Sequence, residues 1–217
     1  MRRVIEKWRR KYNRKHSPSV LDACTRSFLD AIPAMHEGVD GNIALADQFF
    51  AAVSKLEPPI FCDIGANKGD AALRAKRILP NAAIHAFEAN PKIHAAFAAA
   101  PTSMDIGWHN LAVTDETGPV DIFVPRRISH ILKRGRLLKQ DHRESADTGK
   151  GSLLRRNEEA DYDHHVVSGI TLDGFLEGAA PKGDVALWID VEGAASLVFD
   201  GATKTLERTQ IILVEVE

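Results

Sequence analysis

The chain has 217 residues, of which 44% are apolar and 27% charged, a balance typical of a folded globular protein and not of a disordered or fibrous one. Its formal net charge of −2 excludes nucleic-acid binding driven by overall charge. The two cysteines lack metal-type spacing, and no apolar run has the length of a membrane span or the form of a signal peptide, so a cytoplasmic protein is expected.

The first part of the chain, residues 1–58, is predicted to form a basic, helical arm ahead of a main domain that spans 59–217. Residues 1–16 are rich in Lys and Arg, and their apolar side chains recur at roughly helical spacing. The favoured interpretation is a solvated helix that docks through its aromatic residues, and the alternative is a surface that meets phosphate or anionic lipid. Two further helices are expected, over 20–35 and 43–56.

From residue 60 onward the apolar pattern alternates between that of strands and that of helices. Strands are expected over 60–65, 82–90, 104–113, 120–125, 184–193 and 210–216. Helices are expected over 70–79, 91–99 and 194–206. This alternation predicts an α/β fold, with a Rossmann-like, doubly wound and mostly parallel sheet covered by helices on both faces.

A basic segment at about 125–150 interrupts this alternation. It holds many Lys and Arg residues and little apolar pattern, so we expect an insertion or loop over the carboxyl edge of the sheet. Two interpretations are equally favoured, a lid that contacts the substrate and a solvated loop. The basic side chains, which hint at an anionic substrate, include Arg126, Arg127, Lys133, Arg134 and Arg136.

The segment from Asp63 to Gly69 reads DIGANKG and directly follows the first strand. Gly65 and Gly69 permit a tight turn and a close approach of ligand to backbone, and the N–H groups that open the next helix can hold an anion. The spacing differs from the G-x-G-x-x-G of dinucleotide sites, and an aspartate before the loop suits an ammonium group better than a pyrophosphate. The loop therefore favours an amino-acid-bearing ligand over NAD, although any tight strand-to-helix turn can use two glycines.

Acidic residues stand at the ends of two further strands. Glu88 ends the second strand, where a carboxylate can accept hydrogen bonds from both hydroxyls of a ribose. Asp190 and Glu192 follow a later apolar strand and, as candidate catalytic residues, could orient a sulfonium or accept a hydroxyl proton. An alternative for Glu192 is that it only caps the helix that follows. Because ligands of open α/β sheets bind beyond the carboxyl ends of the strands, these acids should face one crevice.

Five segments occur in the order found in FkbM-type methyltransferases, namely DIGANKGD, HAFEANP, NLAVTDETG, TLDGFL and LWIDVEGAASLVFDGA. From about residue 60 to its last residue the chain resembles that family. The resemblance implies a class I fold that uses S-adenosylmethionine, typically for O-methylation of a hydroxyl on a sugar, a polyketide or a similar small metabolite.

The resemblance also implies roles for individual positions. The cofactor-binding residues would be Asp63, Gly65, Ala66, Asn67, Gly69, Glu88, Ala89, Asn90, Asn110, Leu111, Ala112, Ser152 and Asp190. The loop from Asp63 to Gly69 would hold the methionine end, and residues 110–112 would lie beside the adenine. Ser152 would lie between cofactor and substrate, and Asp190 near the reacting methyl.

Some features depart from the family pattern. Ala89 and Ala195 replace a proline and an acid that are usual there. The chain ends directly after the last predicted strand, so the final antiparallel strand pair of class I methyltransferases is expected to be missing, and a partner or the N-terminal helices would cover the sheet edge. Two alternatives therefore stay open, a dinucleotide-dependent oxidoreductase and a non-catalytic, degenerate methyltransferase that serves as a binding module.

The histidines give no metal prediction. His164 and His165 follow an acidic stretch, but their spacing is not diagnostic of a metal site. A base near neutral pH could be His165, His130 or His142. The expected partners are a small-molecule acceptor, anionic or sugar-like, and another chain at the sheet edge, with no nucleic acid and no membrane span.

Overall fold

The structure is a computed structural model that describes residues 39–125, 128–133, 136–141, 152–153, 162–179 and 182–215. The predicted basic helix at 1–16 and the helix at 20–35 lie outside these residues. The chain divides into two compact units, Met1–Asp47 and Gln48–Glu217, and the second contains every strand described below.

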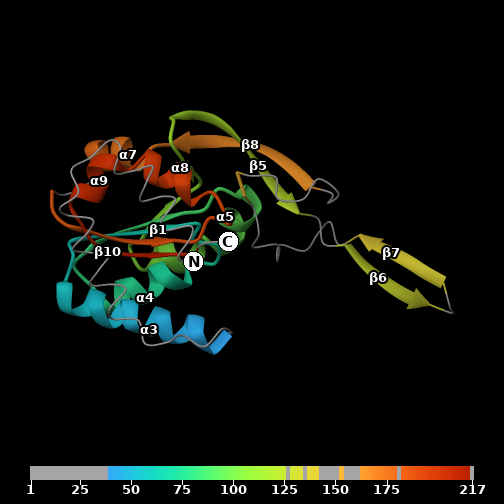
Figure 1. The fold of residues 1–217 in the computed structure, drawn as a ribbon, viewed down its shortest axis with the longest axis horizontal. Coiled ribbons are helices and arrows are strands. Elements are labelled where there is room, and N and C mark those ends of the chain that lie inside the picture. Colours follow the sequence, from blue (N-terminus) through green and yellow to red (C-terminus); the bar gives the residue numbers. More distant parts are fainter. Residues whose placement is uncertain are drawn as a thin grey trace, which may run out of the picture. The chain divides into compact units, whose positions relative to one another are not determined.

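Five parallel strands form the central sheet in the order β10-β9-β1-β2-β3. Figure 1 labels β1 and β10 of this sheet. Their bounds are β1 (Ile60–Ile64), β2 (Ala83–Phe87), β3 (Gly107–His109), β9 (Val185–Ile189) and β10 (Thr209–Val214). The helices are α3 (Val39–Leu56), α4 (Asp70–Ile78), α5 (Pro91–Phe97), α6 (Ala99–Ser103), α7 (Leu172–Ala179), α8 (Ala195–Asp200) and α9 (Thr203–Glu207). The predicted Rossmann-like α/β fold is thereby confirmed, and the strand order reverses between β1 and β9, where such sheets bind ligands.

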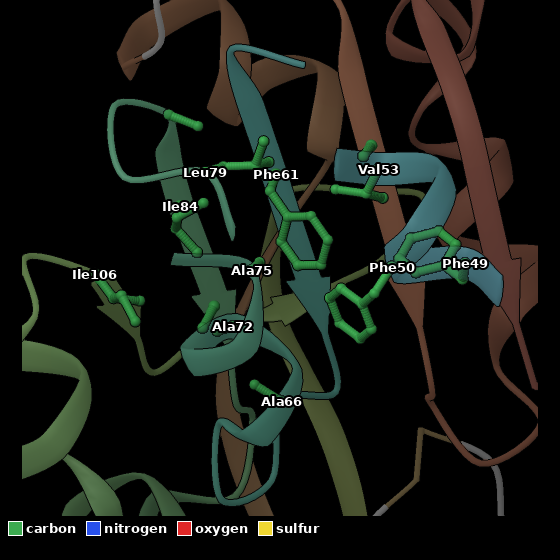
Figure 2. Close-up of a cluster of buried hydrophobic side chains, with 13 residues drawn as sticks. Phe49, Phe50, Val53, Phe61, Ala66, Ala72, Ala75, Leu79, Ile84 and Ile106 are labelled. Atoms are coloured by element: carbon green, nitrogen blue, oxygen red, sulfur yellow. The ribbon is translucent and has the colours of Figure 1, made fainter. Parts of the chain in front are cut away.

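Strand β1 explains why the sheet is covered on both faces. All five of its residues are buried, and alternate side chains point to opposite faces. Phe61 packs against α3 and α4, where Phe50 and Val53 surround it (Figure 2). Ile60 and Ile64 pack on the other face, in the cluster that includes side chains of α7, α8 and α9. A strand buried on both faces is a continuous apolar run, which is why the sequence located it.

The single strand expected over 104–113 is wrong, because the chain there forms two strands in different sheets. Strand β3 ends at His109, and β4 (Ala112–Val113) pairs in parallel with β8 (Tyr162–Ile170). Strand β5 (Gly118–Pro125) runs antiparallel to β8 and completes a three-stranded sheet. The break lies at Asn110, whose side-chain amide donates to the backbone carbonyl oxygens of Glu88 (2.8 Å) and Ala89 (3.1 Å) and so ties the chain to the end of β2.

The loop expected over 125–150 is also wrong over part of its length. Strands β6 (Ile128–Lys133) and β7 (Arg136–Asp141) pair antiparallel, with Ile131 opposite Leu138 and Leu132 opposite Leu137. Backbone pairing needs no uniform apolar pattern, so the many Lys and Arg residues hid these strands from the sequence analysis.

Two expected helices have different bounds in the structure. Helix α3 begins at Val39, before the residue 43 expected from the sequence. The single helix expected over 194–206 is instead α8 and α9, which are separated at Gly201. A Cβ on Gly201 would lie 2.0 Å from the Thr114 carbonyl oxygen, so this position has no room for a side chain.

Candidate active site

A cleft opens at the carboxyl ends of β1, β2 and β9. It contains about 610 Å³ of space, its open mouth included. Many of the predicted site residues line it, namely Gly65, Asn67, Glu88, Ala89, Asn90, Leu111, Ala112, Ser152, Asp190 and Glu192. Other lining residues include Ile93, Ile122, Leu153, Val191 and Ala194, which supply an apolar wall. Asp63, Ala66, Gly69 and Asn110 are not among the lining residues.

Gly65 joins the two sides of the cleft. Its φ is +84°, and a Cβ at this position would lie 1.8 Å from the backbone oxygen of Asp190. The Asp190 N–H donates to the Ile64 oxygen (2.9 Å), so the turn after β9 lies directly on the loop after β1. The close approach that this glycine permits is therefore first of all an approach of the chain to itself.

The glycine loop, residues 63–69, is also held by the end of β2 and lies against β3. The N–H groups of Gly65 and Ala66 both donate to the Phe87 oxygen, at 3.0 and 2.9 Å. Gly69, with φ +81°, is the N-cap residue of α4, and a Cβ there would lie 3.2 Å from the Trp108 ring. Gly69 thus shapes the far end of the loop rather than the cleft wall.

Asp63 lies below the loop and not in the cleft. It is buried, on the same face of β1 as Phe61, and its Oδ2 accepts from the Ala72 N–H (2.9 Å). The N-cap of α4 has no side-chain hydrogen bond, so Asp63 supplies an acceptor to the first turn from outside the helix. Burial raises the pKa of Asp63 to about 7, although the bond from Ala72 opposes the rise. Its position indicates that it fixes α4 on the sheet.

Both oxygens of the Glu88 carboxylate accept hydrogen bonds from backbone N–H groups. Its Oε2 accepts from the Asn67 N–H and its Oε1 from the Asn90 N–H, each at 2.7 Å. Burial raises the pKa of Glu88, and the two backbone bonds oppose that rise. Each carboxylate oxygen keeps further lone-pair capacity, so Glu88 can accept hydrogen bonds from two neighbouring hydroxyls of a ligand.

The two asparagines order the backbone around Glu88. The Asn90 side chain accepts from the Lys92 N–H (3.0 Å) and caps α5, which starts with Pro91. Asn110 holds the carbonyl groups of residues 88 and 89, as described above, and Leu111 then turns into the cleft. Asn110 therefore acts through the backbone of its neighbours.

Asp190 lies at the end of β9, in a strained turn. Glu192 and Gly193 have φ values of 48° and 88°, and a non-glycine residue in this region costs on the order of 1–3 kcal/mol. Burial raises the pKa of Asp190 to about 7, and the nearby acids add to the rise, first Glu215 and then Glu192. Sequence reasoning missed Glu215, although it follows a predicted strand as the other acids do.

Ser152 connects the small sheet to this turn. Its hydroxyl donates to the Glu192 carbonyl oxygen (2.8 Å), and its backbone pairs with that of Phe123 at 2.8 and 3.1 Å. Ser152 is buried, and both Ser152 and Leu153 line the cleft, so this short segment forms part of its wall.

Of the candidate histidine bases His165, His130 and His142, only His165 has a described side chain, and it does not line the cleft. His164 lies on β8 with its Nε2 2.6 Å from Asp121 Oδ1, at an exposed position, and His165 is its neighbour on the same strand. His142 and the side chain of His130 lie outside what the structure describes. Within the described residues no group of three or more His, Cys, Asp or Glu side chains could hold a metal ion, and no helix is long and apolar enough to cross a membrane.

The profile of the methyltransferase FkbM domain matches residues 63–217, which include all the predicted site residues. The chain belongs to this family. A curated relative of this FkbM-domain protein is the 2-O-methyltransferase NoeI of Sinorhizobium fredii (strain NBRC 101917 / NGR234), 28% identical over 167 residues. The match covers 75% of this chain and 66% of the relative, so it spans just under two thirds of the relative's length. No solved structure matches the chain.

Proposed function

We propose that the cleft binds S-adenosylmethionine and that the protein transfers its methyl group to an uncharged hydroxyl of a small metabolite. The observation that carries this proposal is the charge of the cleft. Glu88, Asp190 and Glu192 line it, and no Lys, Arg or His side chain does so among the described residues. S-adenosylmethionine carries an ammonium and a sulfonium, and opposite charges within ~4–6 Å favour each other at a partly buried site.

The hydrogen bonds of the glycine loop support the same ligand. The N–H groups of Gly65, Ala66 and Asn67 already donate to Phe87 or to the Glu88 carboxylate. The loop thus has few free donors for a pyrophosphate, and the acid-lined cleft beside it suits an ammonium group. This favours S-adenosylmethionine over NAD, the main alternative.

The remaining contacts would follow from the walls. Glu88 would accept hydrogen bonds from the ribose hydroxyls, because both of its oxygens are held facing the cleft by backbone groups. The apolar side chains Ile93 and Leu111, with Ala112, would pack against the adenine. Asp190 would lie near the sulfonium end, on the opposite side of Gly65.

Methyl transfer requires alignment more than covalent help from the protein. When bound, S-adenosylmethionine supplies a methyl group that is already activated by the sulfonium. Asp190 would accept the proton of the acceptor hydroxyl as its oxygen becomes a nucleophile. Leu153, Val191 and Ala194 would exclude water from the reacting groups and help to hold the acceptor in line.

An uncharged acceptor fits the cleft better than the anionic one suggested by the basic segment. An anionic group beside Asp190 and Glu192 would be repelled, and no described side chain offers it a counter-charge. The relative is named a 2-O-methyltransferase, which supports oxygen as the atom that is methylated. We therefore propose an alcohol or sugar-like hydroxyl as the acceptor.

Calorimetry with S-adenosylhomocysteine and, separately, with NAD tests the cofactor. We expect the chain to bind S-adenosylhomocysteine and not NAD, and Glu88→Gln to weaken that binding by at least about tenfold, since a charged hydrogen bond contributes ~1.5–3 kcal/mol. Glu207→Gln, on the exposed side of α9, is the matched control and should leave binding unchanged. Binding of NAD alone would support an oxidoreductase, whereas cofactor binding without transfer to any of a panel of sugars and alcohols would favour a binding module.

A further inference from the structure

Glu215 follows β10 and lies beside Asp190 across the sheet. Strands β9 and β10 are parallel, with Val214 opposite Ile189, and the Glu215 N–H donates to the Ile189 oxygen (2.9 Å). The next residue of each strand is therefore Glu215 and Asp190, at a strand separation of about 4.8 Å. Their side chains leave the sheet on the same face, and Glu215 lies close enough to Asp190 to raise its pKa.

The backbone of Asp190 is fixed by its neighbours, which limits the directions that its side chain can take. Its N–H donates to the Ile64 oxygen, and its own carbonyl lies against Gly65. Two carboxyl groups can form a hydrogen bond only when one of them is protonated, so a bond between Asp190 and Glu215 would fix a proton as well as a side-chain position.

Among the described residues, the charged groups that shift the pKa of Asp190, or whose pKa Asp190 shifts, are acidic. They come from four elements, namely Glu215 after β10, Glu192 in the same turn, Glu88 after β2 and Asp63 on β1. Of these acids, Glu215 raises the pKa of Asp190 most. The family match and the predicted site residues do not assign it a role.

We propose that Glu215 is a positioning residue for Asp190, and that the two carboxyl groups form a hydrogen-bonded acid pair that directs Asp190 into the cleft and holds one proton until the pair ionises. Its use in methyl transfer rests on the proposed function, whereas the pair itself does not. While Asp190 is protonated, it donates its proton to Glu215 and cannot act as a base. Once Asp190 is ionised, the neighbouring acids repel its charge, which gives it a greater proton affinity than an ordinary aspartate has.

The acid pair predicts a pH dependence of ligand affinity that a glutamate with a structural role alone would not produce. S-adenosylmethionine is cationic at sulfur, whereas S-adenosylhomocysteine is a neutral thioether. Ionisation of Asp190 should therefore favour the first over the second. Since burial and Glu215 raise the pKa of Asp190 to about 7, the ratio of the two affinities should increase between pH 6 and pH 8.

The direct test is carbon-13 NMR of the full chain labelled at the aspartate carboxyl carbon, with the Asp190 resonance identified as the one missing from Asp190→Asn. In the wild type we expect a titration near pH 7. In Glu215→Gln the midpoint should fall by about one pH unit or more, because the like charge is gone. Glu215→Asp, which keeps the charge, should restore part of the difference, and Glu207→Gln should change nothing.

Calorimetry with both cofactor forms completes the test. In Glu215→Gln the affinity ratio should change less between pH 6 and pH 8 than it does in the wild type. An Asp190 titration that is unchanged in Glu215→Gln would overturn the acid pair, whatever the cofactor results are. If the titration shifts as expected but neither cofactor form binds, the pair stands and the proposed function fails. Glu215 is exposed, so its substitution should not unfold the protein, and thermal unfolding would verify this.

Discussion

Gly65 is the residue whose replacement should damage the site most directly. Its missing side chain leaves room for the Asp190 backbone oxygen, and its positive φ adds a second penalty for any other residue. The two effects act on the same short contact, the one that joins the ends of β1 and β9. The cleft therefore depends on a residue that offers a ligand no functional group.

We expect Gly65→Ala to lower stability by on the order of 1–3 kcal/mol or more and to abolish binding of S-adenosylhomocysteine, because a 1.8 Å contact forces the two turns apart. Gly178→Ala is a matched control, since a Cβ there meets nothing within 4 Å and lies in helix α7, where alanine is favoured. Urea unfolding and calorimetry on both variants measure the difference. Equal stability of the two variants would contradict the tight contact.

Two neighbouring histidines, His85 on β2 and His109 on β3, should make the stability of the protein depend on pH. His85 Nδ1 and His109 Nε2 lie 3.2 Å apart beside Phe175, and His85 Nε2 is buried without a hydrogen-bond partner among the described residues. Burial lowers the pKa of both rings, that of His109 to about 4. The two rings bind protons more readily in the unfolded chain, so protonation favours unfolding. The stability that the neutral rings contribute is therefore fully present above the ordinary histidine pKa, and it is lost as the pH falls towards the pKa of the rings in the folded protein.

We therefore expect the stability of His109→Phe relative to the wild type to increase as the pH falls from 7 to 5. The comparison must be between variants, because Asp63 and Asp190 have raised pKa values and add stability as the pH falls. Urea unfolding at pH 5, 6 and 7 measures the slope. Parallel slopes in the two proteins would show that the histidine pair does not titrate with folding.

At the level of elements, α9 depends on a residue that belongs to α7. Its N-cap, Ala202, has no capping side chain, and Asp173 supplies the missing acceptor. Asp173 accepts from the N–H groups of Lys204 (2.9 Å) and Thr205 (2.8 Å) and from the Thr205 hydroxyl (2.7 Å). Burial raises the pKa of Asp173, but these bonds outweigh it and the pKa is lowered. The TLD segment of the sequence thus connects two helices on one face of the sheet.

Asp173→Ala should cost about 1–3 kcal/mol of stability, since it leaves several donors of α9 without a partner. The measurement is urea unfolding at pH 7, with Glu207→Ala on the exposed side of α9 as the control. A loss no greater than that of the control would show that water replaces the aspartate. Cofactor affinity should be unchanged in the folded Asp173→Ala protein, because Asp173 does not line the cleft.

Strands that are buried along most of their length were predictable from the sequence, and a strand with an exposed face was not. Strands β1, β2 and β9 are largely buried and appear as apolar runs. Strand β8 has an exposed face with His164 and Val166, so its sequence, polar at the start, gave no strand prediction. The segment 104–113 was predicted as one strand because Leu111 is apolar. In the structure Leu111 lies between β3 and β4 and lines the cleft.

The same reasoning explains which site residues were predictable. Glu88 and Asp190 were found because they follow apolar strands whose carboxyl ends meet. Asp63 was expected in the cleft, although the two-residue period of a strand places it on the face of Phe61, towards α4. The hydroxyl contact of Ser152 with Glu192 joins segments far apart in the chain, and no local pattern indicates it.

At the level of the whole molecule, ligand binding should stabilise the entire domain, because the cleft is made from loops of both halves of the sheet. At a concentration a hundred times its dissociation constant, a ligand adds about 2.7 kcal/mol, or roughly 5–10 °C in Tm for a chain of this size. We expect this rise with S-adenosylhomocysteine and a much smaller one in Glu88→Gln. Scanning calorimetry measures it, and the absence of a rise in the wild type at that saturation would contradict binding at this cleft.

The position of β9 in the sheet has a kinetic consequence. Strand β1 ends at Ile64 and β9 begins only at Val185, yet they are neighbours, and the turn after β9 completes the contact with Gly65. Pairing between such distant segments is slow compared with the formation of local helices. A refolding chain should therefore regain helical signal before it regains the cleft, and the return of cofactor binding would time the arrival of β9 between its two neighbours.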